Sequence, residues 1–346
     1  MTLVSPQKLR RGDQLAVLSP SFAAPSAGLA VHEQALRRLR SEFSVEPVEF
    51  PTTRMPNATA EQRAADINAA FADPNIKGII TTVGGTDEIT VLRHLDMELV
   101  REHPKIFIGY SDNTHLHHFL WGLGIQSFYG GSTQVHIGAG PGVDEIHRKS
   151  LEAVLFSGVA LELYEPGESE DYGHFWHLPE ALTHYGTRHA TRPWTWAGPS
   201  KKVTGRTWGG CLESLSGIAL ADRLPSMAQL DGAILLLETS EELPRPSLVK
   251  QWLLGLGERG VFDAVAGVVI ARPPVTYFDR MLDFEAAEQE RQHYEDTVLS
   301  TITQYSESLV ACFGVPFGHT RPQWIMPHGG VLTLDGTMRT VTADYS

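Results

Sequence analysis

Short apolar runs alternate with longer segments of helical periodicity through the first half of the chain, and this alternation restricts the fold more than any other feature. The runs at 13–21, 77–85 and 105–111 have the length of strands, and 27–40 has apolar residues at helical spacing. Repeated strand–helix units with nearly continuous apolar strands are typical of a parallel sheet that is covered by helices on both faces. We therefore predict an α/β fold.

The other elements of this half follow the same alternation. Pro74 disfavours helical geometry at Asp73, so a helix is expected to end there. We predict further strands at 44–50 and 125–131, and further helices at 59–72, 86–100 and 113–124.

Parallel α/β sheets bind their ligands beyond the carboxyl ends of the strands. In this sequence those ends are followed by residues 19–21, 84–88 and 110–114. We expect these three segments to lie together at a functional site.

The regular pattern stops near residue 160 and resumes near residue 205. The segment between them is rich in Gly, Pro, His and aromatic residues without clear periodicity, and its length is typical of a linker or a lid. Strand and helix patterns return at 232–238, 246–260, 266–273, 283–307 and 309–320, followed by a hairpin that turns at Asp335 and Gly336. A chain of 346 residues exceeds the usual size of one domain. We predict domains at 1–160 and 206–346, joined by 161–205.

The composition excludes several classes of function. The chain has 28 Lys and Arg residues against 41 Asp and Glu, a net charge of −13, which argues against a nucleic-acid polymer as its main partner. Cys211 and Cys312 are the only cysteines, so we expect neither a disulfide framework nor a four-thiolate zinc site. The N-terminus lacks the pattern of a signal peptide, and no stretch reaches the roughly 20 apolar residues that span a bilayer. We expect no membrane contact and a cytoplasmic location.

Ser111 follows an apolar strand and precedes a helix, which allows two interpretations. A serine on a tight strand-to-helix turn can act as a nucleophile, because amides at the helix N-terminus stabilise an oxyanion, although the full G-x-S-x-G spacing is absent. Ser111 or Asp112 could instead cap the helix, and this segment alone favours the cap.

A nucleophilic serine needs a base, and the base needs an orienting carboxylate. His319 lies beside Gly318 directly after an apolar run. Glu238 ends the strand GAILLLE, where an unpaired buried carboxylate is costly, although a Glu just past a strand end is commonly exposed. Alone, neither residue decides the question.

Three further features leave alternatives open. The three histidines of NTHLHH share no single helix face and have no evident third partner for zinc, so we predict no metal site. The glycine pairs in VGGTDE and GRTWGGC match no phosphate-binding motif. Trp176, Trp194 and Trp196 either form a substrate platform or pack a long loop onto the body of the protein.

Six segments, taken together, resemble the serine peptidase family that contains L,D-carboxypeptidases and the microcin C immunity protein. They are GDQLAVLSPS, TTVGGTDE, KIFIGYSDNTHLHH, GRTWGGCLESL, ILLLETSEE and VPFGHTRPQWIMPHGG, in the family order and across almost the whole chain. The resemblance implies an N-terminal parallel-sheet (Rossmann-like) domain that carries the serine. It also implies a C-terminal β-rich α/β domain, with the active site at the interface of the two.

The resemblance also implies a catalytic triad of Ser111 as nucleophile, His319 as base and Glu238 as the residue that orients the base. Backbone amides of Gly85 and Asp112 are expected to form the oxyanion hole. This chemistry requires no metal and no organic cofactor. Relatives suggest a homodimer.

Two substrates are compatible with the family: an aminoacyl–nucleotide amide of the microcin C type, and a murein tetrapeptide that loses its terminal D-alanine. The segment from VGGTDE to IGYSD looks closer to the immunity-protein branch. Trp194 and Trp196 are expected to contact the substrate, as is Cys211, which stands where many relatives have Asn. A non-catalytic module that sequesters a toxic nucleotide or peptide is the alternative from another class of function.

Overall fold

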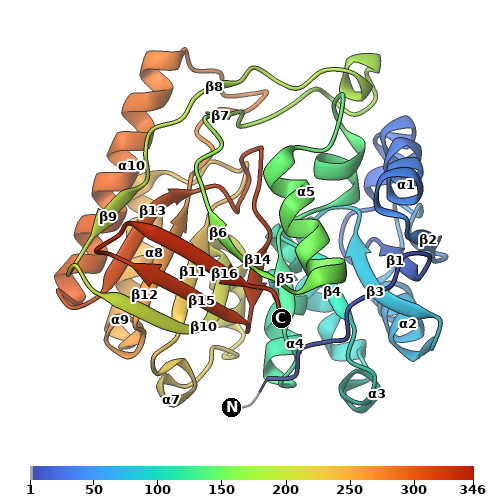
Figure 1. The fold of residues 1–346 in the computed structure, drawn as a ribbon, viewed down its shortest axis with the longest axis horizontal. Helices are drawn as coiled ribbons and strands as arrows, with labels where there is room; N and C mark the ends of the chain where they lie inside the picture. The colour runs from blue at the N-terminus through green and yellow to red at the C-terminus, as the bar shows by residue number, and fades with distance from the viewer. Residues whose placement is uncertain (1–2) are drawn as a thin grey trace.

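A computed structural model describes residues 3–346, and most of its strands belong to two large sheets that lie next to each other (Figure 1). The first sheet has the order β14-β5-β4-β3-β1-β2. These strands are β1 Gln14–Leu18, β2 Glu46–Glu49, β3 Ile76–Thr81, β4 Ile106–Gly109, β5 Ser127–Tyr129 and β14 Met326–His328. β1 to β5 are parallel, and β14 pairs antiparallel with β5. The predicted α/β fold with a parallel sheet is confirmed.

Helices cover both faces of this sheet, as alternation along its strands requires. In β1, Leu15 and Val17 belong to one buried cluster, whereas Ala16 and Leu18 belong to another. The first cluster includes residues of α1 and α5, and the second includes residues of α2 and α4. The helices of this half are α1 Leu29–Phe43, α2 Ala60–Ala72, α3 Met97–Glu102, α4 Thr114–Gly122 and α5 Glu145–Glu152.

The ends of α2 follow from its sequence. Thr59 and Gln62 form a capping box at its N-terminus. Its C-terminal cap, Asp73, has an extended backbone, in agreement with the prediction from Pro74.

The single helix predicted at 86–100 is wrong. The segment instead forms two short 3-10 turns, Glu88–Thr90 and Leu92–His94, followed by α3. Leu95 and Asp96 have extended backbones, and the Asp96 carboxylate accepts hydrogen bonds from the amides of Glu98 and Leu99. Asp96 therefore starts a new helix where the periodicity alone suggested a continuous one.

The second sheet has the order β6-β16-β15-β10-β11-β12-β13-β9. Its strands are β6 Ala160–Leu163, β9 Thr195–Ala197, β10 Lys202–Cys211, β11 Ile234–Glu238, β12 Gly267–Ala271, β13 Val310–Val315, β15 Val331–Asp335 and β16 Thr340–Asp344. β10 to β13 are parallel, and the remaining pairings are antiparallel, including the predicted hairpin of β15 and β16. The helices are α6 Leu212–Leu220, α7 Met227–Leu230, α8 Pro246–Glu258, α9 Val261–Ala264 and α10 Phe284–Tyr305.

The segment between the halves is anchored at several points. It contains a two-stranded ribbon of β7 Glu168–Ser169 and β8 His189–Ala190, which crosses from the side of α10 towards α5 (Figure 1). The Asp171 carboxylate forms ion pairs with Arg272 at 2.8 Å and with Arg291 at 2.6 Å. These contacts attach the segment to the second half, so it packs onto the body of the protein.

The two halves exchange strands and share a core. β14 comes from the C-terminal part of the chain but lies in the first sheet, and β6 and β9, on either side of the ribbon, lie in the second. One buried cluster joins Tyr129 of the first sheet to Leu236 of the second. The arrangement fixes the carboxyl ends of β4 and β11 relative to each other.

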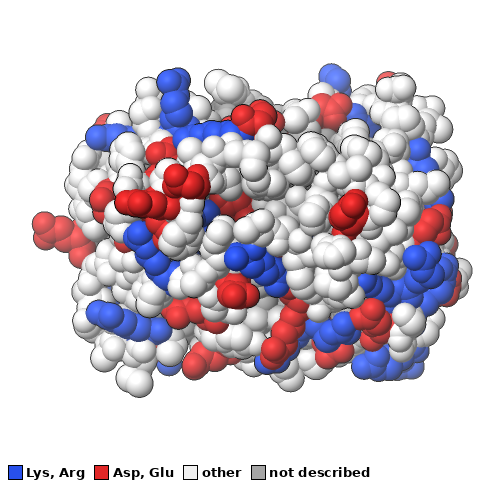
Figure 2. Space-filling view, turned by 90° about the horizontal axis from the view of Figure 1, so that it is seen from above, with Lys and Arg blue, Asp and Glu red and all other residues white. Residues whose placement is uncertain are grey.

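The charge of the surface and the character of the helices are relevant to two predicted absences, those of a nucleic-acid partner and of a membrane-spanning segment. On the face shown in Figure 2, acidic and basic side chains are interspersed, with no broad basic area. Among the helices of residues 3–346, none has both the length and the apolar character needed to cross a membrane.

Candidate active site

Ser111 lies on a sharp turn between β4 and α4. Its backbone has φ +65°, a left-handed conformation that is rare for a residue with a side chain and costs on the order of 1–3 kcal/mol. The position before α4 is occupied by Asn113, and no side chain caps the helix there. The helix-cap interpretation of Ser111 is therefore wrong, and the strained turn presents this side chain at the end of the strand.

Glu238 and His319 meet beside this turn. Glu238 is the last residue of β11 and is 2% exposed, and its Oε2 lies 2.6 Å from Nδ1 of His319. The alternative in which Glu238 is exposed is excluded by this burial. A buried carboxylate that accepts a hydrogen bond from Nδ1 fixes the ring orientation and leaves Nε2 available for proton transfer.

Tyr129 links the serine turn to this pair, although it was not among the predicted site residues. Its hydroxyl donates a hydrogen bond of 2.5 Å to Oε1 of Glu238 and accepts one of 3.1 Å from the amide of Ser111. Tyr129 is fully buried at the carboxyl end of β5. The strand-end rule that selected the loops after β1, β3 and β4 would also have selected it.

Nε2 of His319 faces a second carboxylate, that of Glu241, at 3.1 Å. Burial alone would lower the pKa of His319, but the carboxylates of Glu238 and Glu241 outweigh it and raise the pKa to about 9. The imidazole is thus protonated at neutral pH in this arrangement.

The loop after β3 packs against the serine. A Cβ on Gly84 would lie 2.9 Å from Oγ of Ser111 and 3.0 Å from the amide of Asp112. Gly85 has φ +156°, and a Cβ there would lie 2.1 Å from Oγ of Ser21. Both glycines are required for this close approach.

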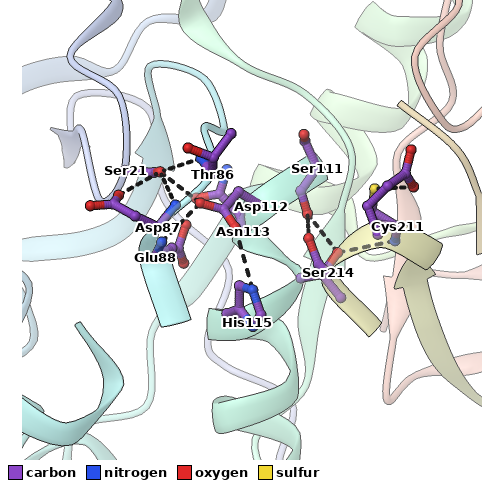
Figure 3. A network of polar contacts seen from close by, with 12 residues as sticks. Ser21, Thr86, Asp87, Glu88, Ser111, Asp112, Asn113, His115, Cys211 and Ser214 are labelled. Atoms are coloured by element: carbon purple, nitrogen blue, oxygen red, sulfur yellow. Dashed lines mark hydrogen bonds and ion pairs between the residues drawn. The ribbon is translucent and has the colours of Figure 1, made fainter. Parts of the chain in front are cut away.

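Polar contacts hold the three predicted loops together (Figure 3). Oγ of Ser21 donates to the Asp112 carboxylate at 2.6 Å and accepts from the amide of Thr86 at 3.1 Å. The same Asp112 carboxylate accepts a hydrogen bond of 2.9 Å from the amide of Glu88. Residues 19–21, 84–88 and 110–114 therefore do lie together, as the strand-end rule predicted.

Comparisons with known proteins agree with this geometry. Residues 15–130 match the LD-carboxypeptidase N-terminal domain, and residues 204–334 match the LD-carboxypeptidase C-terminal domain, both of peptidase family S66. Together these matches cover more than half of the chain. The chain belongs to the LD-carboxypeptidase family. It is a serine carboxypeptidase, and thus a hydrolase.

Individual relatives extend the comparison. A Vibrio cholerae protein named as a carboxypeptidase is 29% identical over 275 residues, which are 75% of this chain and 77% of that protein. The microcin C7 self-immunity protein MccF of Escherichia coli is 27% identical over 283 residues, 81% of this chain and 77% of MccF. A solved structure of MccF with glutamyl sulfamoyl guanosine covers 98% of each chain at 23% identity with a TM-score of 0.84, and another contains aspartyl sulfamoyl adenosine. The likeness to MccF shows the fold.

In this member of the LD-carboxypeptidase family, a pocket lies beside His319. Its lining includes Tyr110, Trp176, Tyr185 and His319. Trp176 and Tyr185 come from the irregular segment, so the predicted linker supplies one wall of the pocket.

The other predicted substrate contacts lie elsewhere. Trp194 is 9% exposed and belongs to a buried cluster, Trp196 packs against that cluster, and neither lines the pocket beside His319. Cys211 is 2% exposed, and its thiol donates to Glu213 at 3.1 Å. Burial, together with Glu238 and Glu213, raises the pKa of this thiol well above its usual value, so it stays protonated.

The histidines of NTHLHH make contacts within the protein, and His115 pairs with the Asp112 carboxylate at 3.4 Å. Nδ1 of His117 lies 2.7 Å from Oγ of Ser127, and its Nε2 lies 2.8 Å from the carbonyl oxygen of Gly109. Burial lowers the pKa of His117 to about 3 and that of His118 to about 4. Within the described part of the chain, no cluster of three His, Cys, Asp or Glu side chains is arranged to hold a metal ion.

Proposed function

We propose that this protein hydrolyses the amide bond of aminoacyl–nucleotide compounds through a triad of Ser111, His319 and Glu238, and so detoxifies them. The observation that carries the proposal is the convergence of a strained serine turn with a buried His–Glu pair. Tyr129 joins the two by hydrogen bonds to the Ser111 amide and to Glu238.

The roles in the reaction follow from the chemistry of the groups. Neutral His319 accepts the hydroxyl proton of Ser111 while Oγ forms a bond to the amide carbonyl carbon. The tetrahedral intermediate expels the amine, which takes its proton from the imidazolium, and an acyl-enzyme remains. Water then attacks the ester, again with His319 as the base, and Ser111 is regenerated. Glu238 stabilises the imidazolium in both halves of the cycle.

We assign the oxyanion hole to the backbone amides of Gly85 and Asp112. The close packing of the Gly84–Gly85 loop on Ser111, and the hydrogen bonds from Ser21 that tie this loop to Asp112, support the assignment. Each donor of this kind contributes about 2.7–4 kcal/mol to lowering the barrier.

Two observations support a nucleotide-containing substrate. Trp176 and tyrosines line the pocket beside His319, and aromatic faces stack on nucleobases. The chain also has the fold of MccF, whose solved structures hold aminoacyl sulfamoyl nucleosides.

The test uses purified protein and an aminoacyl sulfamoyl adenosine, with release of the amino acid followed by chromatography. Wild type is expected to turn the compound over, and Ser111→Ala is expected to be inactive. No turnover by the wild type, or equal turnover by the variant, would refute the proposal. In cells exposed to the compound, protection by Ser111→Ala equal to that by wild type would favour sequestration over hydrolysis.

A second candidate activity is release of D-alanine from murein tetrapeptides. It is favoured by the match of both halves to LD-carboxypeptidase domains. The same assay with a murein tetrapeptide decides between the two, because a higher kcat/KM for the tetrapeptide would assign the protein to peptidoglycan recycling.

A further inference from the structure

The contact between Glu241 and His319 conflicts with catalysis. Oε2 of Glu241 lies 3.1 Å from Nε2 of His319, the atom that has to accept the proton of Ser111. A carboxylate in this position favours the imidazolium, which cannot act as a base. Glu241 must therefore leave Nε2 before the reaction begins.

Glu241 is held by fewer contacts than Glu238. It lies in the turn after β11, and its side chain is 43% exposed, whereas that of Glu238 is fully buried. Its Oε2 is buried against the imidazole but makes no hydrogen bond within residues 3–346. A close but poorly aligned ion pair of this kind is weaker than a hydrogen-bonded one and is readily exchanged.

In the described part of the chain, no cation other than His319 pairs with Glu241. The groups facing this region are mostly acidic or neutral: Glu213 and Glu238, Tyr110 and Tyr277, and the neutral His136. Arg321, on the pocket wall, is held by Asp144 at 2.6 Å and by backbone carbonyls. A displaced Glu241 carboxylate is thus complementary to a cation that the substrate brings.

We propose that Glu241 binds the ammonium group of the substrate's acyl residue and selects substrates in which that amino group is free. The inference rests on the proposed function. In an aminoacyl compound the ammonium nitrogen is two bonds from the carbonyl carbon, about 2.5 Å away. Nε2 of His319 exchanges a proton with Oγ of Ser111 and with the leaving nitrogen, and both atoms are bonded to the same carbonyl carbon. A carboxylate that reaches Nε2 therefore also comes within reach of the ammonium nitrogen.

This exchange couples recognition to activation. When the ammonium group takes the Glu241 carboxylate, His319 loses one of its two anionic neighbours and becomes able to act as the base. A substrate whose amino group is acetylated leaves the Glu241–His319 contact in place and reacts slowly.

The experiment compares alanyl sulfamoyl adenosine with its N-acetyl derivative in the wild type, in Glu241→Gln and in the control Glu242→Gln. Glu242 is the exposed neighbour of Glu241. Its replacement by Gln removes the same negative charge without touching the contact to His319. Wild type and Glu242→Gln are expected to prefer the free amine in kcat/KM by roughly 10- to 100-fold, the value of one charge-assisted contact. In Glu241→Gln the ratio is expected to fall to near one, because the free amine loses its partner while the N-acetyl compound meets a His319 that Glu241 no longer occupies.

The inference is overturned if wild type hydrolyses both compounds equally, or if Glu241→Gln keeps the wild-type preference. A loss of preference in Glu242→Gln of the same size would also overturn it, because the effect would then come from net charge. Failure of the wild type to hydrolyse either compound is a different result, which refutes the proposed function and this inference with it.

Discussion

At the scale of single residues, the site depends on how buried groups are paired. Glu238 has its two oxygens occupied by His319 and Tyr129, so its desolvation is compensated. The sequence predicted Ser111, Glu238 and His319 only through a resemblance of whole segments. Tyr129 and Glu241 were missed because their roles depend on contacts with residues 109 and 78 positions away along the chain.

The pH dependence of the reaction tests the environment of His319. Because its pKa is raised to about 9 and the base has to be neutral, kcat/KM is expected to rise with pH and to level off above about 9. In Glu241→Gln, which removes one of the two carboxylates that raise this pKa, the rise is expected at lower pH. A flat wild-type profile between pH 5 and 8 would contradict the role of His319 as the base.

Replacement of Tyr129 tests the link between the serine turn and the triad. Tyr129→Phe leaves the Ser111 amide and one oxygen of Glu238 without their partner, and a buried unsatisfied group costs about 1–3 kcal/mol. We expect kcat to fall by roughly 10-fold or more and the melting temperature to decrease. Tyr305→Phe, which removes a hydroxyl bonded to Glu258 instead, is the control and should keep its activity. Equal kinetics of the two variants would show that Tyr129 does not position the site.

At the scale of elements, local patterns predicted where strands end better than how loops and breaks are built. The loops after β1, β3 and β4 lie together as expected because a parallel sheet places their carboxyl ends on one edge. The helix at 86–100 failed because Asp96 competes for the backbone amides of Glu98 and Leu99. The burial of Trp194 was not predicted, because it depends on the pairing of the next strand, β9, with β13, which has no local pattern in the sequence.

The connection among these three loops is expected to depend on Ser21. Ser21→Ala removes the hydrogen bonds that join Thr86 of the glycine loop to the Asp112 carboxylate. If this connection aligns the oxyanion donors, kcat should fall by roughly 10-fold while KM changes little, since the interaction acts in the transition state. Ser26→Ala, which removes a bond to the carbonyl of Ala23, provides the control. A change confined to KM would argue against alignment of the oxyanion hole.

At the scale of the whole molecule, the active site belongs to both halves. Ser111 follows a strand of the first sheet, and Glu238 ends a strand of the second. The sequence predicted two domains with a site between them, but not the exchange of β14 into the first sheet, because strand pairing over such separations has no local signature. One shared core holds the halves together.

The oligomeric state remains a prediction at this scale. The homodimer is an expectation from the sequence, and light scattering on the purified protein would then give twice the 38.1 kDa of one chain. A mass of one chain at micromolar concentration would contradict this expectation.

The acyl-enzyme is the central species of the proposed mechanism, and its detection is the most direct test. Wild-type protein is mixed with alanyl sulfamoyl adenosine, quenched in acid within the first turnover and digested for mass spectrometry. The account predicts an alanyl adduct on Ser111 that is absent from Ser111→Ala. Turnover without an adduct at Ser111, or an adduct on another residue that survives in Ser111→Ala, would contradict it.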